Sequence, residues 1–157
     1  MNDLQTLDIT TCVSNTVVQV FDTMLSMAVE IFPENPPPLP DGLRYVGSVA
    51  FAGDATGSVS LEMSDAFARL LTANMLGMET EEIEGTEEIE DVIGELSNMI
   101  GGDVKSRFCD RGLPCELSVP SITSGSNFRI EQVGTMHREL IGIGFQEYIA
   151  HVQVCIK

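Results

Sequence analysis

Basic residues are scarce in this sequence. Only 8 lysines and arginines accompany 24 aspartates and glutamates, so the formal net charge at pH 7 is −16, and the basic residues form no cluster. Because nucleic acids and anionic membrane surfaces are also negatively charged, both should repel this chain. The composition therefore predicts neither a nucleic-acid nor a membrane partner. It favours basic surfaces, metal-loaded sites or proteins recognised by their shape.

Long apolar segments and paired cysteines are missing as well. No run approaches the ~18 residues of a membrane span, and the opening MNDLQTLDITT has neither the basic region nor the apolar core of a signal peptide. The four cysteines form no CxxC pair and have no histidine at ligand spacing, which argues against a zinc site. Cys12 and Cys155 lie in apolar patterns and are predicted to be small core residues. These features indicate a reducing, cytoplasmic environment.

The residues that are present suffice for one hydrophobic core. The chain has 157 residues, of which 43% are hydrophobic, and its mean hydropathy is +0.13. These values predict a single compact domain over residues 1–157.

Apolar residues at helical spacing predict two long helices. The first spans 8–31, with Asp8 or Thr10 as its N-cap and Pro33 at its end. The second spans 86–108, and its apolar residues fall on one arc when each residue turns the helix by about 100°. These residues are Ile89, Val92, Ile93, Leu96, Met99, Ile100 and Val104.

Alternating patterns predict the strands and, with the helices, the fold class. The predicted strands span residues 45–51, 57–63, 115–119, 128–132, 139–146 and 148–156. A short helix, capped by Ser64 or Asp65, should run through Leu76, and Gly77 should stop it. The last two strands meet as a tight hairpin or as one bent strand. This order predicts an α+β fold in which helices cover one face of a mainly antiparallel sheet.

Two further segments allow more than one interpretation. The proline-rich segment 33–42 could be a ligand for a proline-binding module, but an ordered crossing loop is the more ordinary interpretation. The acidic segment 78–91 could suggest a calcium site, but it lacks the D-x-D-x-D-G spacing. Acidic residues at a helix entrance interact favourably with the helix dipole, so we interpret this segment as a solvated helix start.

A weak internal repeat accompanies the order of elements. Residues 11–15 can be laid over residues 94–98, which matches a serine and an asparagine in each copy. Only the second copy has a glutamate, Glu95, where the first has Cys12. Since a long helix precedes strands in both halves, the sequence predicts a pseudo-twofold domain whose two long helices lie side by side.

The second long helix carries an exposed polar stripe opposite its apolar arc. Asp91, Glu95, Asn98 and Gly102 are spaced 4, 3 and 4 residues apart, so they line up along one side. Gly101 and Gly102 each cost roughly 1 kcal/mol in a helix interior relative to alanine. A carboxylate, an amide and bare backbone therefore share a surface on which another molecule can dock closely.

The chemistry of this stripe is incomplete by itself. Glu95 could be a general base, a metal ligand or an ion-pair partner. Asn98 cannot exchange a proton at neutral pH, but its amide can hold a water molecule in a fixed orientation. The sequence has no P-loop, and neither His137, which we interpret as a surface residue, nor His151 lies near a serine or cysteine motif. A partner would have to supply the rest of an active site.

The spacing around this helix resembles a known family. Asp91-x-x-x-Glu95-x-x-Asn98, followed by Pro120 and Gly125, is similar to the CheC/CheX/FliY phosphatases of bacterial chemotaxis. IGELSNMIGGDVKSRF resembles the active helix of the CheX branch, and VPSITSG resembles the strand end that follows it. The gap between Asn98 and Pro120 is one residue shorter than is usual in the family.

This resemblance implies a CheC-like fold and a partner-dependent activity. It implies a phosphatase for a phosphorylated, CheY-like response regulator, in which Glu95 pairs with a regulator lysine and Asn98 orients the attacking water. The regulator would supply Mg²⁺ and the phosphoaspartate, so the chain itself needs no metal and no cofactor. A homodimer joined at a sheet edge is also implied. We further predict four partner-docking residues, namely Asp91, Gly101, Gly102 and Lys105.

Two other functions are compatible with the same residues. A non-catalytic adaptor would keep the docking face, although the presence of both Glu95 and Asn98 argues against it. A component of the flagellar switch would share the fold but is expected to carry additional segments. In the simplest alternative, Glu95 and Asn98 are only solvated surface residues.

Overall fold

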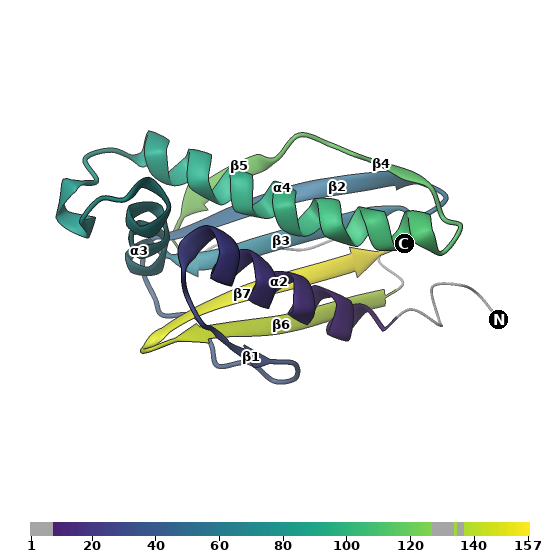
Figure 1. Cartoon of the computed structure of the whole chain (residues 1–157), viewed down its shortest axis with the longest axis horizontal. Coiled ribbons are helices and arrows are strands. Elements are labelled where there is room, and N and C mark those ends of the chain that lie inside the picture. The colour runs from purple at the N-terminus through teal and green to yellow at the C-terminus, as the bar shows by residue number, and fades with distance from the viewer. Residues whose placement is uncertain (1–7, 127–133, 135–136) are drawn as a thin grey trace.

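A seven-stranded sheet carries three helices on one of its faces (Figure 1). The computed structural model describes residues 8–126, 134 and 137–157. Every strand pair in these ranges is antiparallel, in the order β1-β6-β7-β3-β2-β4, and β5 also pairs with β2. The helices are α2 (Ile9–Leu25), α3 (Asp65–Leu76) and α4 (Thr86–Asp110), with a 3₁₀ turn η1 (Thr80–Glu82). The strands are β1 (Glu30–Phe32), β2 (Arg44–Gly53), β3 (Gly57–Ser64), β4 (Cys115–Leu117), β5 (Ser121–Gly125), β6 (His137–Phe145) and β7 (Tyr148–Ile156).

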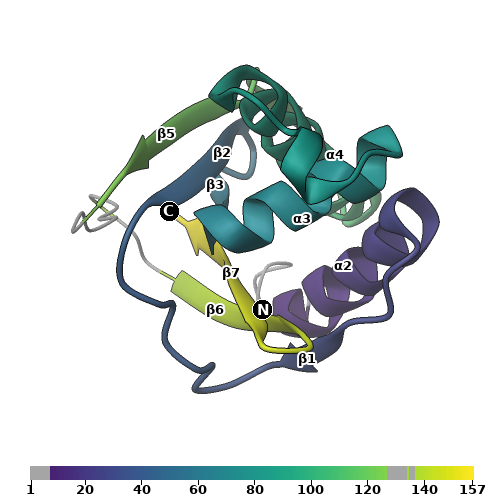
Figure 2. The same ribbon diagram turned by 90° about the vertical axis from the view of Figure 1, so that its left-hand side faces the viewer.

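The α+β class and the shared face of the two long helices are confirmed. Figure 2 shows the sheet on one side and α2, α3 and α4 on the other, and α2 is in contact with α4. The helical face of the sheet and the inner faces of the helices form one continuous core. Among the helices that the structure describes, none is long and apolar enough to cross a bilayer.

The strand order agrees with the predicted pseudo-twofold. The central pair is β3 with β7, and each is flanked by its own hairpin partner, β2 or β6. Each outer strand then comes from the opposite half of the chain: β1 pairs with β6, and β5 pairs with β2. The antiparallel pair β3 and β7 has a local twofold axis between its strands. This axis relates β2 to β6 and β5 to β1, so the strand order is similar from either edge of the sheet.

The first long helix is shorter than predicted. It begins as expected, with the Asp8 side chain accepting from the Thr11 backbone N–H at 3.0 Å, and hydrogen bonds from Thr11 lower the pKa of Asp8. It ends at Leu25 instead of residue 31, because Ser26 is left-handed and closes the helix. Residues 30–32 form β1 instead. Apolar spacing alone could not reveal this end, since pairing with β6 is a long-range contact.

The other elements follow the sequence pattern more closely. Ser64 caps α3 by accepting from a backbone N–H, and Gly77 closes it in a left-handed conformation, as predicted. Strands β6 and β7 form the tight hairpin rather than one bent strand. The predicted strand 115–119 is shortened to β4, and β5 was not among the predicted strands. The predicted strand 128–132 lies outside the described residues.

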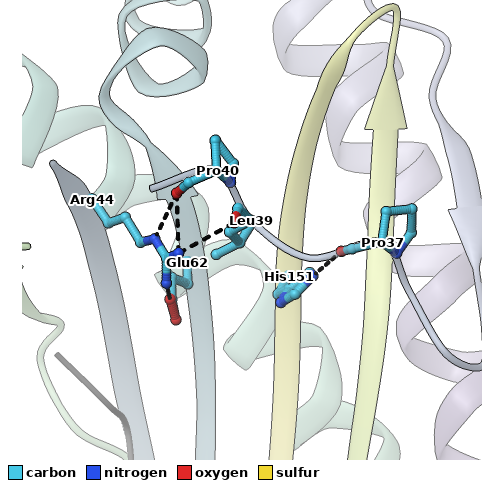
Figure 3. Close-up of polar contacts among 6 residues, drawn as sticks. All are labelled: Pro37, Leu39, Pro40, Arg44, Glu62 and His151. Carbon is cyan, nitrogen blue, oxygen red and sulfur yellow. Dashed lines mark hydrogen bonds and ion pairs between the residues drawn. The ribbon is translucent and has the colours of Figure 1, made fainter. Parts of the chain in front are cut away.

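The proline-rich segment 33–42 is an ordered connection on the sheet face opposite the helices (Figure 3). His151 Nε2 donates to the carbonyl oxygen of Pro37 at 2.7 Å. The Arg44 guanidinium donates to the carbonyl oxygens of Leu39 and Pro40 at 3.2 and 3.0 Å. His151 and Arg44 thus donate hydrogen bonds to backbone carbonyl oxygens that would otherwise be bonded only to water. These bonds hold the segment in place as it crosses from β1 to β2.

Candidate functional site

An open groove of about 370 Å³ runs between the exposed side of α4 and strand β5. It is lined by Glu90, Asp91, Gly94, Glu95, Asn98, Pro120 and Ile122. The predicted residues Asp91, Glu95 and Asn98 are all exposed here. They point outward because the opposite side of α4 is buried over its whole length, from Ile89 to Phe108. Amphipathic packing therefore presents the carboxylate and the amide one turn apart.

Gly94 forms the floor of this groove. It is buried, and a Cβ at this position would lie 3.6 Å from both Pro120 Cγ and Ile122 Cδ1. The two side chains from the edge of the sheet therefore reach over bare helix backbone. Sequence reasoning connected Pro120 to the motif only through the family resemblance, and it missed Glu90, Gly94 and Ile122. The spacing of Glu90, Gly94 and Asn98, four residues apart, was the available signal.

The edge of the sheet is interrupted beside Asn98. Strands β4 and β5 both pair with β2, and Ser118 bridges them: its N–H donates to Ala50 O at 2.8 Å, and its Oγ accepts from Ala50 N–H at 2.9 Å. Val119 then bulges out and is 84% exposed. Pro120 follows. Proline has no N–H to donate to a neighbouring strand, and at the edge of a sheet this missing donor breaks no ladder hydrogen bond. This break turns Pro120 toward the groove.

The two helix glycines have different roles. Gly102 is open, with no atom within 4 Å of the position of a Cβ. Gly101 is buried, and a Cβ there would collide with the Val49 side chain of β2. Gly101 therefore lies in the contact between α4 and the sheet and not on the exposed side of the helix. Because Gly101 has no side chain, α4 can lie close to the sheet. The sequence alone did not show which of the two adjacent glycines faces the sheet.

The remaining predicted docking residue, Lys105, faces the sheet edge. Its Nζ lies 3.9 Å from Glu116 Oε2 on β4, and the lysine side chain is 33% exposed. Lys105 and Gly102 are not among the residues that line the groove. Of the predicted docking set, Asp91 alone lines the groove together with Glu95 and Asn98.

The groove is negatively charged. Glu90, Asp91 and Glu95 line it, and none of its described lining residues is basic. Glu87 and Glu88 add charge in the first turn of α4. No group of three or more His, Cys, Asp or Glu side chains within the described ranges could hold a metal ion. The arrangement can therefore attract a cationic group and orient a polar molecule.

The corresponding position of the first half is different. On α2, Asn15 is exposed, but Cys12 is half-buried against the core. The nearby Thr16 hydroxyl hydrogen-bonds to Asp103 of α4, whose carboxylate also accepts from Arg107 Nε at 3.1 Å. In the first half, the residues near this position therefore link α2 to α4 by hydrogen bonds.

The predictions of a buried Cys155 and a surface-exposed His137 are confirmed. Cys155 is buried, as predicted. His137 is an exposed surface residue, and its Nε2 lies 2.9 Å from Glu139 Oε1.

This arrangement of three helices on one face of an antiparallel sheet is a CheC-like fold. The family model "Chemotaxis phosphatase CheX" matches residues 45–143, which include the groove, and the chain belongs to this family. No curated protein sequence matches the chain.

Solved structures show the same fold at low sequence identity. The chemotaxis protein CheX from Vibrio vulnificus is 22% identical, with a TM-score of 0.80 over 96% of this chain and 97% of that chain. A CheC-like superfamily protein from Shewanella sp. PV-4 is 23% identical, with a TM-score of 0.81 over 96% and 99%. The CheX–CheY–BeF₃–Mg²⁺ complex from Borrelia burgdorferi contains a chain that is 18% identical, with a TM-score of 0.76 over 96% and 98%.

Proposed function

We propose that this chain is a phosphatase that hydrolyses the aspartyl phosphate of a CheY-like response regulator. The observation that carries the proposal is the pair Glu95 and Asn98, both exposed and one turn apart in an open groove. Family membership supports the reaction class. We also propose that residues 1–157 act as a single domain in the cytoplasm.

Asn98 is the proposed catalytic residue. Its carboxamide oxygen accepts a hydrogen bond from water, which directs the oxygen lone pair of that water toward phosphorus. The water oxygen then bonds to phosphorus, the bond between phosphorus and the aspartyl oxygen breaks, and inorganic phosphate and an aspartate carboxylate result. Asn98 exchanges no proton in this step, so its contribution is orientation alone.

The partner supplies the other groups. In the complex from Borrelia burgdorferi, CheX is bound to CheY with BeF₃ and Mg²⁺, which supports a CheY-like partner that brings Mg²⁺ with it. Mg²⁺ would neutralise charge on the phosphoryl oxygens. The groove of this chain places no basic group of its own among the described residues that line it, so its Glu95 is available to a cation of the regulator.

Replacing Glu95 with alanine should weaken both regulator binding and dephosphorylation, each by roughly tenfold, because it removes one charge of a partly desolvated ion pair. The matched control is Glu88→Ala, which removes an exposed carboxylate of the same helix outside the groove. Titration of the regulator and its rate of phosphate loss should be measured for both variants. An equal loss in both would mean that Glu95 acts only through general charge.

Sedimentation should report a dimer. The described sheet ends in the three-residue strand β1 on one side and in β4 and β5 on the other. Pairing one such edge with a second copy would remove an exposed row of backbone hydrogen-bonding groups. At micromolar concentration we expect about twice the mass of the 17.0 kDa chain. A monomer under these conditions would contradict the proposed assembly without affecting the proposed reaction.

A further inference from the structure

A second open groove, of about 620 Å³, lies at the end of the sheet where β6 turns into β7. Two segments that are distant in the sequence line it: the proline-rich segment, through Pro38, Leu39 and Pro40, and the hairpin, through Tyr148 and its neighbours. None of the described residues that line this groove also lines the groove beside α4. The two grooves are therefore separate surfaces.

Both lining segments are fixed by contacts within the chain. Arg44 Nη2 donates to the carbonyl oxygens of Leu39 and Pro40 at 3.2 and 3.0 Å, which holds the proline-rich segment against the sheet (Figure 3). The Tyr148 ring stacks on Phe67, a buried side chain of α3, with the ring centroids 5.3 Å apart. A surface that is already ordered loses little conformational entropy when a partner binds to it.

The groove combines apolar surface with negative charge. Asp41 and Glu147 line it and are exposed, and no basic side chain is found among its described lining residues. An arginine side chain matches this combination. Its aliphatic stem packs on apolar side chains, while its planar guanidinium stacks on an aromatic ring and pairs with carboxylates.

The start of α3, which also borders this groove, does not favour an anion. Helix N-termini attract anions through their dipole and their free N–H groups. Here Ser64 Oγ accepts from Phe67 N–H at 3.2 Å, and Asp65 N–H donates to Leu43 O at 3.0 Å. Asp65 also adds a carboxylate to the first turn. A cationic ligand is therefore the better match.

We propose that this groove binds an arginine-containing segment of a partner protein, whose guanidinium stacks on Tyr148 and pairs with the carboxylates of Asp41 and Glu147. A second copy of this chain is a poorer occupant, because its 8 basic residues form no cluster and four of them already lie within ion-pair distance of carboxylates in their own chain. The proposal is independent of the phosphatase activity, since Glu95 and Asn98 line the other groove.

The test titrates the full, ¹⁵N-labelled chain with the peptide acetyl-Leu-Arg-Leu-amide at millimolar concentration and follows the backbone amide signals by NMR. The largest saturable shifts should fall on residues 38–41 and 147–149. The same peptide with citrulline in place of arginine keeps the shape but has no charge, so it should bind roughly tenfold more weakly.

Two variants with exposed, charged side chains test the carboxylates without disturbing the core. Glu147→Gln and Asp41→Asn should each weaken binding of the arginine peptide by about threefold, as expected for one ion pair at an exposed site. The matched control is Glu88→Gln, which removes the same charge at an exposed position outside both grooves and should leave the affinity unchanged.

Several results would overturn the proposal. Equal binding of the citrulline peptide would show that the carboxylates do not select a cation. Shifts centred on the groove beside α4, or an equal loss of affinity in Glu88→Gln, would show only general attraction to an acidic protein. No saturable binding at all would refute the site outright. If the signals of residues 38–41 and 147–149 move with protein concentration alone, a second copy fills the groove instead.

Discussion

Alanine at position 98 should slow regulator dephosphorylation by roughly 100-fold or more, because orientation of the attacking water is lost. Binding should stay nearly unchanged, since Asn98 is exposed and carries no charge. The measurement follows the loss of phosphate from a purified, phosphorylated CheY-like regulator, together with a separate titration of binding.

The fold provides matched controls for this variant. Asn15→Ala removes the exposed asparagine of the first half, and Cys12→Ala alters the position that aligns with Glu95; both should leave the rate unchanged. Equal rates for wild type and Asn98→Ala would refute the mechanism and favour the adaptor function, in which the groove only binds. A large loss in Cys12→Ala would show that the first half takes part in the reaction.

The second large effect concerns stability, and it separates the two adjacent glycines. Gly101→Ala should lower the free energy of unfolding by about 1–3 kcal/mol, because its Cβ would collide with Val49, a buried side chain with little rotational freedom. Gly102→Ala should raise it by up to ~1 kcal/mol, because nothing lies within 4 Å and alanine favours the helix. Urea unfolding of the two variants measures both changes.

The activities of these variants carry separate information. If bare backbone at Gly102 lets the regulator approach, Gly102→Ala should weaken binding in a protein that is more stable than wild type. Unchanged binding would remove Gly102 from the docking surface. Equal loss of stability in both variants would contradict the assignment of Gly101 to the contact with β2.

The sequence correctly predicted those elements whose ends are determined by residues nearby in the chain. Ser64 and Gly77 bound α3 through cap geometry that depends on neighbouring residues only. The spacing of Glu95 and Asn98 placed both on the outer side of α4, since burial of the opposite arc determines the rotation of the helix. The candidate site could therefore be recognised before the fold was known.

Features that depend on distant contacts could not be predicted in this way. The apolar spacing of residues 24–31 continues a helical pattern, yet Phe32 packs on Gly142 and Gly144 of β6, where added Cβ atoms would approach it to 3.1 and 2.8 Å. Residues 121–125 are rich in serine and glycine, and they form a strand because β2 offers a free edge. The groove itself arises where that strand passes Gly94.

The exchange of outer strands between the two halves makes the fold indivisible. Glu30 pairs with Gly144, and Gly125 pairs with Arg44, so the contacts that complete the sheet join residues distant in the sequence. A chain that had formed only one half would leave a hairpin edge without its closing strand, and such non-local pairings favour slow, all-or-none folding. The half without the Glu–Asn pair is therefore indispensable: its strand β2 is the support on which the edge of the groove is built.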